Sequence, residues 1–121
     1  MRLFLCLEKS TLNRTNLEHA YVALLIMAAF HAAFFFLGLP LGHWVGFVAG
    51  AFFFLGREYT QAEREIAKAR GVTILSLSWY TALDFRLWSR DARLDLMFPV
   101  AACLGAALLV ELLRLLMRSL M

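Results

Sequence analysis

The sequence predicts an all-α membrane protein with three transmembrane helices and a charged helical cytoplasmic hairpin between the second and the third. Composition is the first reason: 62% of the 121 residues are hydrophobic and 17% are charged, with a mean hydropathy of +0.70. Soluble domains have about 45–50% apolar and about 25% charged residues. The second reason is that residues 20–56 contain no Asp, Glu, Lys or Arg. The third is the 11 Phe residues, several of them in runs, which the small interior of a soluble fold of this length cannot hide.

The first two predicted spans share the uncharged block. A helix that crosses a bilayer needs about 20 residues, so the block can hold two spans if it is broken once. Pro40 is the natural break, because a proline disfavours helical geometry in the residue before it. We expect the first transmembrane helix over about 17–39, and the second over about 41–58 with a cytoplasmic extension to about 70.

The third span is the shortest apolar block, running from Leu96 to Val110. Its length covers only about 22 Å at the rise of an α-helix, so the span must also use the leucines that follow, with Arg114 reaching toward water. Gly71 and the β-branched run after it predict a linker over 71–80. A helix over about 81–95 then leads into the third transmembrane helix over about 96–117.

The distribution of Lys and Arg predicts the orientation. Ten of the twelve lie before the first span or between the second and third, and none lies near Pro40. The positive-inside rule then places the N-terminus and the long loop in the cytoplasm and the C-terminus outside a bacterial inner membrane. The short apolar run LFLCL, with no cleavage motif after it, predicts that the N-terminus stays attached.

A glycine stripe is the most specific packing signal. Gly42, Gly46 and Gly50 repeat every four residues on the second predicted span, and small residues at this spacing let helices approach closely in lipid. The stripe can serve two purposes: it can pack against the first helix of the same chain, or it can join copies of the chain into a homo-oligomer.

Charges in the predicted hairpin repeat at helical spacing on both of its arms. If the arms pack antiparallel, Arg57 or Arg64 can pair with the aspartates, although exposed pairs contribute only about 0–1 kcal/mol each. Alternatively, Glu58, Glu65, Asp91 and Asp95 converge as a carboxylate cluster for a metal or a proton. The hairpin residues are Arg57, Glu58, Gln61, Arg64, Glu65, Asp84, Asp91 and Asp95.

His31 lies in the middle of the first predicted span and Glu111 lies inside the third, where ionisable residues are costly and often functional. A hydrogen-bonded packing role is the alternative for His31, and Glu111 can pair with Arg114 one turn later. No Glu-x-x-His spacing, nucleophile-base pair or phosphate-binding glycine loop is present. We therefore predict no enzyme activity, no catalytic residue, no metal and no cofactor.

Two runs, FFFLGREYTQAE at 52–63 and WSRDARLDLMFP at 88–99, resemble small integral membrane proteins encoded by tailed phages and prophages, which are often described as holin-like. The resemblance covers roughly the last two thirds of the chain and implies a phage membrane protein. The matching positions are Gly56, Arg57, Glu58, Gln61, Ala62, Glu63, Trp88, Asp95 and Pro99.

The function expected from these features is a holin-like factor that self-associates and permeabilises the inner membrane. The alternative is an accessory membrane protein that binds a host or phage partner through its charged hairpin, as in superinfection exclusion. In both cases the expected partners are the lipid bilayer, further copies of the chain and a protein at the hairpin, and no nucleic acid.

Overall fold

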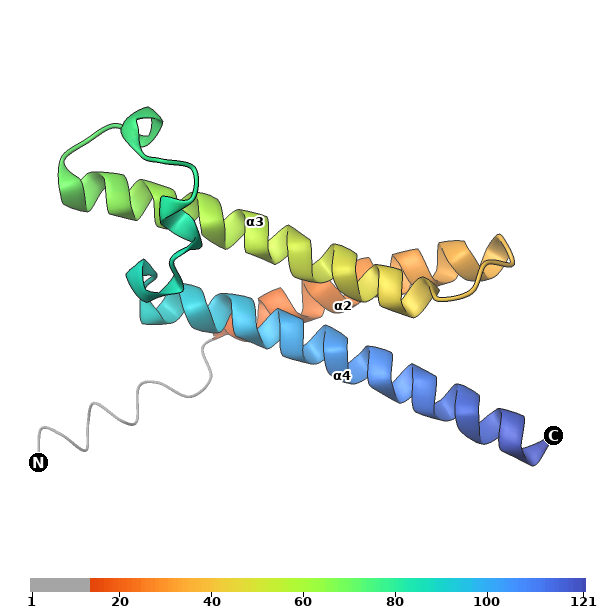
Figure 1. Ribbon diagram of the computed structural model, residues 1–121. Helices are drawn as coiled ribbons and strands as arrows, with labels where there is room; N and C mark the ends of the chain where they lie inside the picture. The colour runs from red at the N-terminus through yellow and green to blue at the C-terminus, as the bar shows by residue number, and fades with distance from the viewer. Residues whose placement is uncertain (1–13) are drawn as a thin grey trace, which may run out of the picture.

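The structure, a computed structural model, describes residues 14–121, and all of its regular structure is helical (Figure 1). Three long helices, α2 (Arg14–Phe36), α3 (Gly42–Arg70) and α4 (Arg90–Leu120), carry the fold. Three short 3₁₀ turns, η1 (Ile74–Ser76), η2 (Thr81–Leu83) and η3 (Phe85–Leu87), lie between α3 and α4. The predicted all-helical class is confirmed for this part of the chain.

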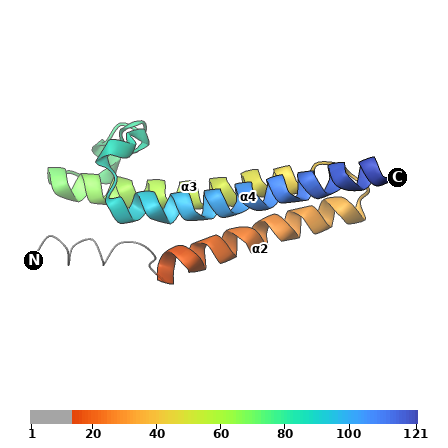
Figure 2. The ribbon, with the colours of Figure 1, turned by 90° about the horizontal axis from the view of Figure 1, so that it is seen from below.

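The three long helices pack side by side, each against the other two (Figures 1 and 2). Helices α2 and α4 run in the same direction, and α3 returns antiparallel to both. The connection over residues 71–89 folds back on the end of α3, and the C-terminus lies at the opposite end of the bundle.

The break between α2 and α3 falls at the predicted place. Gly38 takes a left-handed conformation (φ 67°) that costs glycine nothing, and Leu41, unusually for a branched residue, takes the same φ directly before α3 begins. The amide of Leu39 donates to the carbonyl of Phe34 at 2.9 Å, which satisfies one of the last carbonyls of α2.

The far end of α3 also follows its sequence signal. Gly71 is left-handed (φ 65°), and the amide of Val72 reaches back to the carbonyl of Ala67 at 3.0 Å, the pattern of a glycine C-cap. The helix predicted from residue 81 is wrong, however, because residues 81–87 form 3₁₀ turns. Helix α4 starts at Arg90, where the Ser89 hydroxyl accepts from the amide of Ala92 at 3.1 Å as an N-cap.

Two of the long helices, α2 and α4, are long and apolar enough to cross a membrane. The expectation of three such helices is wrong, because α3 does not reach that hydropathy. Its uncharged part covers only residues 42–56, which include His43 and four glycines, and Arg57 follows at once. By length and composition, α3 differs from its neighbours in being half apolar and half charged.

Two buried clusters fill the bundle. The first lies in the shared part of the three helices and contains Ala23, Met27, Phe54, Cys103 and Ala107. The second joins α3 to the connection and the start of α4, and contains Ala62, Ile66, Ala82, Trp88 and Ala92. Small residues dominate both, so the helix backbones lie close together.

Trp88 fixes the connection to the bundle. Its side chain is 3% exposed, and its indole Nε1 donates to the carbonyl of Ala82 at 2.7 Å. We expect Trp88→Phe to lose about 1–2 kcal/mol, because the buried carbonyl loses its donor. Limited proteolysis within 71–89 should then be faster, whereas Trp79→Phe, at a side chain that is 73% exposed, should leave the rate unchanged. Equal rates in both variants would contradict this role.

Candidate functional site

Ionisable side chains gather between the helices at two levels of the bundle. The His19 cluster consists of His19, Arg57, Glu58 and Asp95, and the His43 cluster consists of His31, His43, Glu111 and Arg114. His19 and His31 are twelve positions apart on α2, so the two levels are about 18 Å apart. The first buried cluster, which is apolar, lies between them.

The His19 cluster takes one side chain from α2, two from α3 and one from α4. The Arg57 Nη1 atom lies 2.7 Å from Glu58 Oε1 and 2.9 Å from His19 Nε2. On its other side, His19 Nδ1 lies 3.5 Å from Asp95 Oδ1. The Glu58 side chain has no exposed surface, and its second oxygen, Oε2, has no hydrogen-bond partner among the described residues.

Arg57 decides which nitrogen of His19 carries the proton. A guanidinium can only donate, so Nε2 of His19 must accept, and in the neutral ring the proton lies on Nδ1, which faces Asp95. A nitrogen that carries a proton cannot bind a metal. One ligand atom from each of His19, Glu58 and Asp95 lies within 4.8 Å of the others, a spacing that a metal ion could use. With Arg57 in place, however, the orientation of His19 suits a network of charged side chains better, in which Nδ1 lies near Asp95 without a hydrogen bond among the described residues.

The charges of this network would balance only with one added proton. With both carboxylates ionised and the imidazole neutral, the single guanidinium would leave one net negative charge between the helices, and an uncompensated buried charge is costly. One proton would neutralise the cluster, and the unpartnered Oε2 of Glu58 is a site for it. Pro99, one turn after Asp95, has no amide hydrogen, so the Asp95 carbonyl also lacks its helical donor.

The His43 cluster lies near the α2–α3 turn. The fully buried His43 places Nε2 2.9 Å from Glu111 Oε2, and Arg114 Nη1 lies 4.0 Å from the same oxygen. The ring of His31 packs edge-on against His43, with the centroids 5.8 Å apart. The structure therefore brings together the two intramembrane candidates from the sequence, His31 and Glu111, through a third residue.

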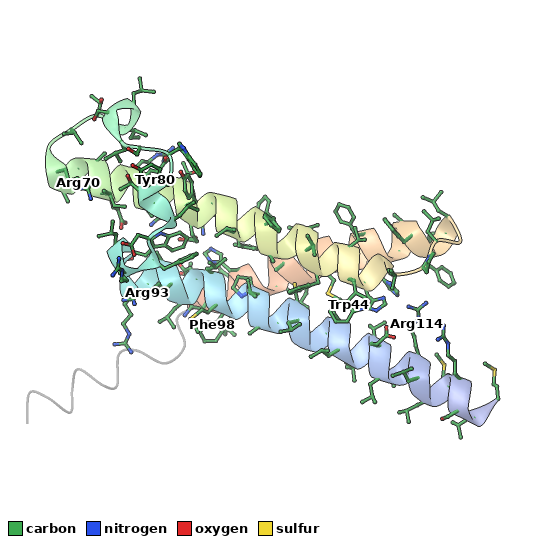
Figure 3. The ribbon with its side chains drawn as sticks, viewed as in Figure 1. Trp44, Arg70, Tyr80, Arg93, Phe98 and Arg114 are labelled. Carbon is green, nitrogen blue, oxygen red and sulfur yellow. The ribbon has the colours of Figure 1, made fainter. Side chains whose placement is uncertain are left out.

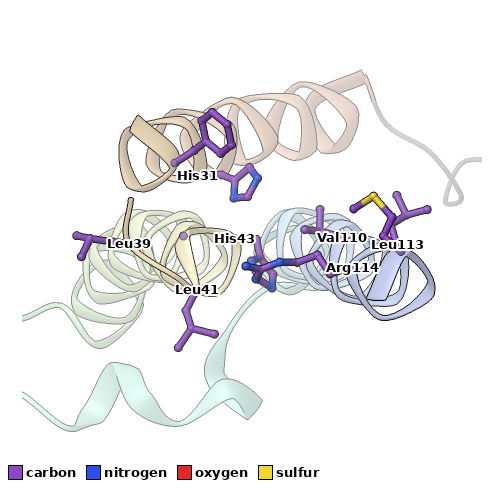
Figure 4. Close-up of a pocket in the computed structure, with 10 residues that line it drawn as sticks. His31, Leu39, Leu41, His43, Val110, Leu113 and Arg114 are labelled. Carbon is purple, nitrogen blue, oxygen red and sulfur yellow. The ribbon is translucent and has the colours of Figure 1, made fainter. Parts of the chain in front are cut away.

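A pocket of about 370 Å³ opens beside this cluster, between the α2–α3 turn and the last turns of α4 (Figure 4). His31, His43 and Arg114 approach it from three different helices, and its other walls are apolar. The lining residues are His31, Phe35, Leu39, Leu41, Gly42, His43, Val110, Leu113, Arg114 and Met117.

The glycine stripe faces α2 of the same chain. A Cβ atom on Gly46 would lie 2.5 Å from the Met27 carbonyl oxygen, and one on Gly42 would lie 2.5 Å from Cβ of Phe34. Gly50 meets the Ala23 carbonyl in the same way, at 3.2 Å. All three glycines are buried in this contact, so a homo-oligomer would have to use a different surface.

The charged hairpin is arranged differently from the expectation. Among residues 14–121, no ion pair joins Arg57 or Arg64 to the aspartates: Arg57 pairs with its neighbour Glu58, and Asp84 pairs with Arg86. The Arg86 side chain donates two hydrogen bonds of 2.9 Å to Asp84 and holds the pKa of that carboxyl below its ordinary value. Of the proposed carboxylate cluster, only Glu58 and Asp95 meet. The remaining hairpin residues are exposed: Gln61, Arg64, Glu65 and Asp91.

Sequence reasoning missed His19 and His43, although helical spacing contains a signal for both. His19 lies on one face of α2 with the buried Ala23 and Met27, four and eight residues later. His43 lies three and seven residues before the buried Gly46 and Gly50. A histidine on the buried face of a helix points toward the adjacent helices. Its ring nitrogens are then shielded from water and need a hydrogen-bond partner on one of those helices.

Five of the nine residues that carry the resemblance to phage membrane proteins belong to two of these clusters. Arg57, Glu58 and Asp95 belong to the His19 cluster, whereas Ala62 and Trp88 belong to the second buried cluster. Comparison of the chain with protein-family models, curated proteins and solved structures found no match.

Proposed function

We propose that the chain is a non-enzymatic integral protein of the bacterial inner membrane that acts in a holin-like manner, by assembling copies that permeabilise the bilayer. The observation that carries the proposal is the distribution of side chains. Small and ionisable residues lie inside the bundle, while large apolar residues point outward along α2 and α4. Outward-facing residues include Leu24, Leu25, Phe30, Leu104, Leu108, Leu109, Leu112 and Leu116.

Exposing this apolar surface to water would be unfavourable for a monomer. A soluble monomer rarely exposes a continuous apolar patch of more than a few hundred Å², whereas lipid solvates one without cost. Helix α3, which is less apolar, returns antiparallel to α2 and α4 within the same bundle. Its outer face also exposes large apolar side chains. That outer face carries Val45, Val48, Phe52 and Phe53. In this proposal α3 crosses the same layer, with its polar side covered by α2 and α4.

Within residues 14–121, a single chain provides no path for ions. Ala23, Met27, Phe54 and Cys103 fill the space between the two charged levels, and each is at most 5% exposed. Permeabilisation would therefore require several chains. Four exposed alanines on α2 provide a face at which another helix could approach closely in lipid: Ala28, Ala29, Ala32 and Ala33.

Induced expression in a bacterium tests this proposal through the membrane potential. We expect a potential-sensitive dye to report abrupt depolarisation and growth arrest. The double change Ala29→Leu and Ala33→Leu should abolish both, together with crosslinked oligomers, at an unchanged level in the membrane, because larger side chains separate the approaching helices. Leu108→Ile on α4 is the control and should behave as wild type. Growth and potential that stay normal with the wild-type chain would rule out the holin-like mechanism.

The second candidate is an accessory protein that binds a partner through the connection at 71–89. Leu75, Trp79 and Tyr80 are 97%, 73% and 60% exposed there, and Arg70 lies at the same end of the bundle as Tyr80 (Figure 3). Exposed aromatic residues beside arginine are typical of protein interfaces. Normal growth of cells expressing the chain, with a protein captured by the wild type and lost with Trp79→Ala, would favour this function.

The proposed orientation can be tested separately. With ten of the twelve Lys and Arg on the cytoplasmic side, a phosphatase reporter fused after Met121 should be active and one fused after Arg70 should be silent. Activity after Arg70 and silence after Met121 would invert the orientation. Activity at both positions would mean that the chain between them does not cross the membrane.

A further inference from the structure

We propose that the pocket beside the His43 cluster binds an anionic phospholipid, with the phosphate on Arg114 and the start of the acyl chains against the apolar walls. This inference rests on the proposed location in a membrane. The pocket lies at the end of the bundle away from the connection over residues 71–89, where Figure 3 shows Arg114 near Trp44 and far from Arg70.

Arg114 is the anchor because its guanidinium lacks a close acceptor. No hydrogen bond from it to residues 14–121 is formed, and its approach to Glu111 is 4.0 Å, which is too long for one. The same Glu111 oxygen already bonds His43 at 2.9 Å. A side chain that is 35% exposed, with up to five N–H donors, can therefore accept two oxygens of a phosphate at once.

The surrounding charges suit a ligand with a single negative charge. Arg118, one turn after Arg114, lines the adjoining hollow together with Arg114 and Met117, so two arginines lie on this side. The carboxylate of Glu111 offsets one of them, and His43 holds that carboxylate away from Arg114. Basic pockets between transmembrane helices bind anionic head groups at cytoplasmic and matrix surfaces, and the proposal extends the same charge complementarity to the opposite surface.

The walls distinguish a lipid from a free anion. Phe35, Leu39, Leu41, Val110, Leu113 and Met117 offer only apolar surface, which adds nothing to the binding of inorganic phosphate but favours the first carbons of an acyl chain. The volume of about 370 Å³ lies within the range of about 300–1,000 Å³ usual for small-molecule pockets. The pocket therefore holds the junction of head group and chains, and the rest of the chains would follow the outer face of α4.

Native mass spectrometry of the purified chain in detergent tests the inference, with phosphatidylglycerol and phosphatidylcholine supplied at equal concentration. We expect the wild type to retain phosphatidylglycerol preferentially. Arg114→Gln should reduce that retention about tenfold, the loss expected when charge-assisted hydrogen bonds disappear. Arg93→Gln removes the same charge from the exposed start of α4 and should change nothing.

Each of the other possible results would contradict a specific part of the proposal. Equal retention of the two lipids, or retention that Arg114→Gln does not alter, would remove the anionic lipid site. If inorganic phosphate alone stabilised the chain against heat as well as phosphatidylglycerol does, the site would serve a soluble anion. Extraction of the chain into the soluble fraction by an alkaline wash would instead contradict the membrane proposal, so the two failures can be told apart.

Discussion

Gly46→Ile is expected to destabilise the bundle by about 3 kcal/mol or more, because overpacking a contact between two backbones leaves little room to relax. Even the first added carbon would lie 2.5 Å from the Met27 carbonyl oxygen and 2.9 Å from Met27 Cα. Neither atom belongs to a side chain that can rotate away, so α2 and α3 would have to separate. The free energy of unfolding in mixed micelles, followed by helical circular dichroism, measures the effect.

Gly56→Ile is the matched control for this change. Gly56 lies on the same helix, and a Cβ atom there would meet nothing within 4 Å. We expect its stability to equal or exceed that of the wild type, since glycine is a poor helix former. If Gly46→Ile and Gly56→Ile were equally stable, the packing of α3 on α2 would be wrong. Loss of oligomers from a fully stable Gly46→Ile chain would show that the stripe joins copies after all.

Arg57→Ala is expected to cost about 2 kcal/mol, because it leaves the buried carboxylate of Glu58 without its charged partner. The estimate is below that for a fully buried pair, since Arg57 is 45% exposed and water screens part of its charge. The substitution also removes the donor to His19 Nε2, which would free the ring to change its tautomer. Unfolding in mixed micelles again gives the free energy.

The double variant Arg57→Ala/Glu58→Gln separates the energy of the Arg57–Glu58 ion pair from the other effects of replacing Arg57. In a Glu58→Gln background Arg57 no longer has a carboxylate in direct contact, so the cost of Arg57→Ala should fall to less than half of its value in the wild type. Arg64→Ala, at an exposed position on the same helix, should be nearly neutral. An equal cost of Arg57→Ala in both backgrounds would contradict the ion pair.

Local signals in the sequence explain why the helix ends were predictable. Pro40 and Gly71 act on the backbone within a few residues, so the turn after α2 and the C-cap of α3 could be foreseen. The start of α4 could not, because Trp88 packs on α3 and Ser89 caps the helix only once the connection has folded back. Residues 81–87 contain no proline or glycine to indicate that an α-helix would not form there, yet they form 3₁₀ turns.

The candidate site was only partly predictable, for a related reason. Glu58 and Asp95 could be singled out as acidic residues on helix faces, but their meeting at His19 depends on how three helices rotate against one another. The expected pairing of Arg57 with the aspartates failed because its neighbour Glu58 is within reach at 2.7 Å. The absence of charge over residues 42–56 was likewise a poor guide to α3, because its glycines lower its hydropathy and also permit its close packing.

The membrane location is tested most directly by a spin label on the outer face of α4. Leu108, 53% exposed, would carry the label in a chain whose two cysteines are replaced by alanine, and a label at Lys68 would report the expected aqueous end of α3. In lipid vesicles, we predict that molecular oxygen reaches the label at 108 while a water-soluble nickel reagent does not, with the reverse at 68. Access of the nickel reagent to position 108 would contradict a bilayer-embedded bundle.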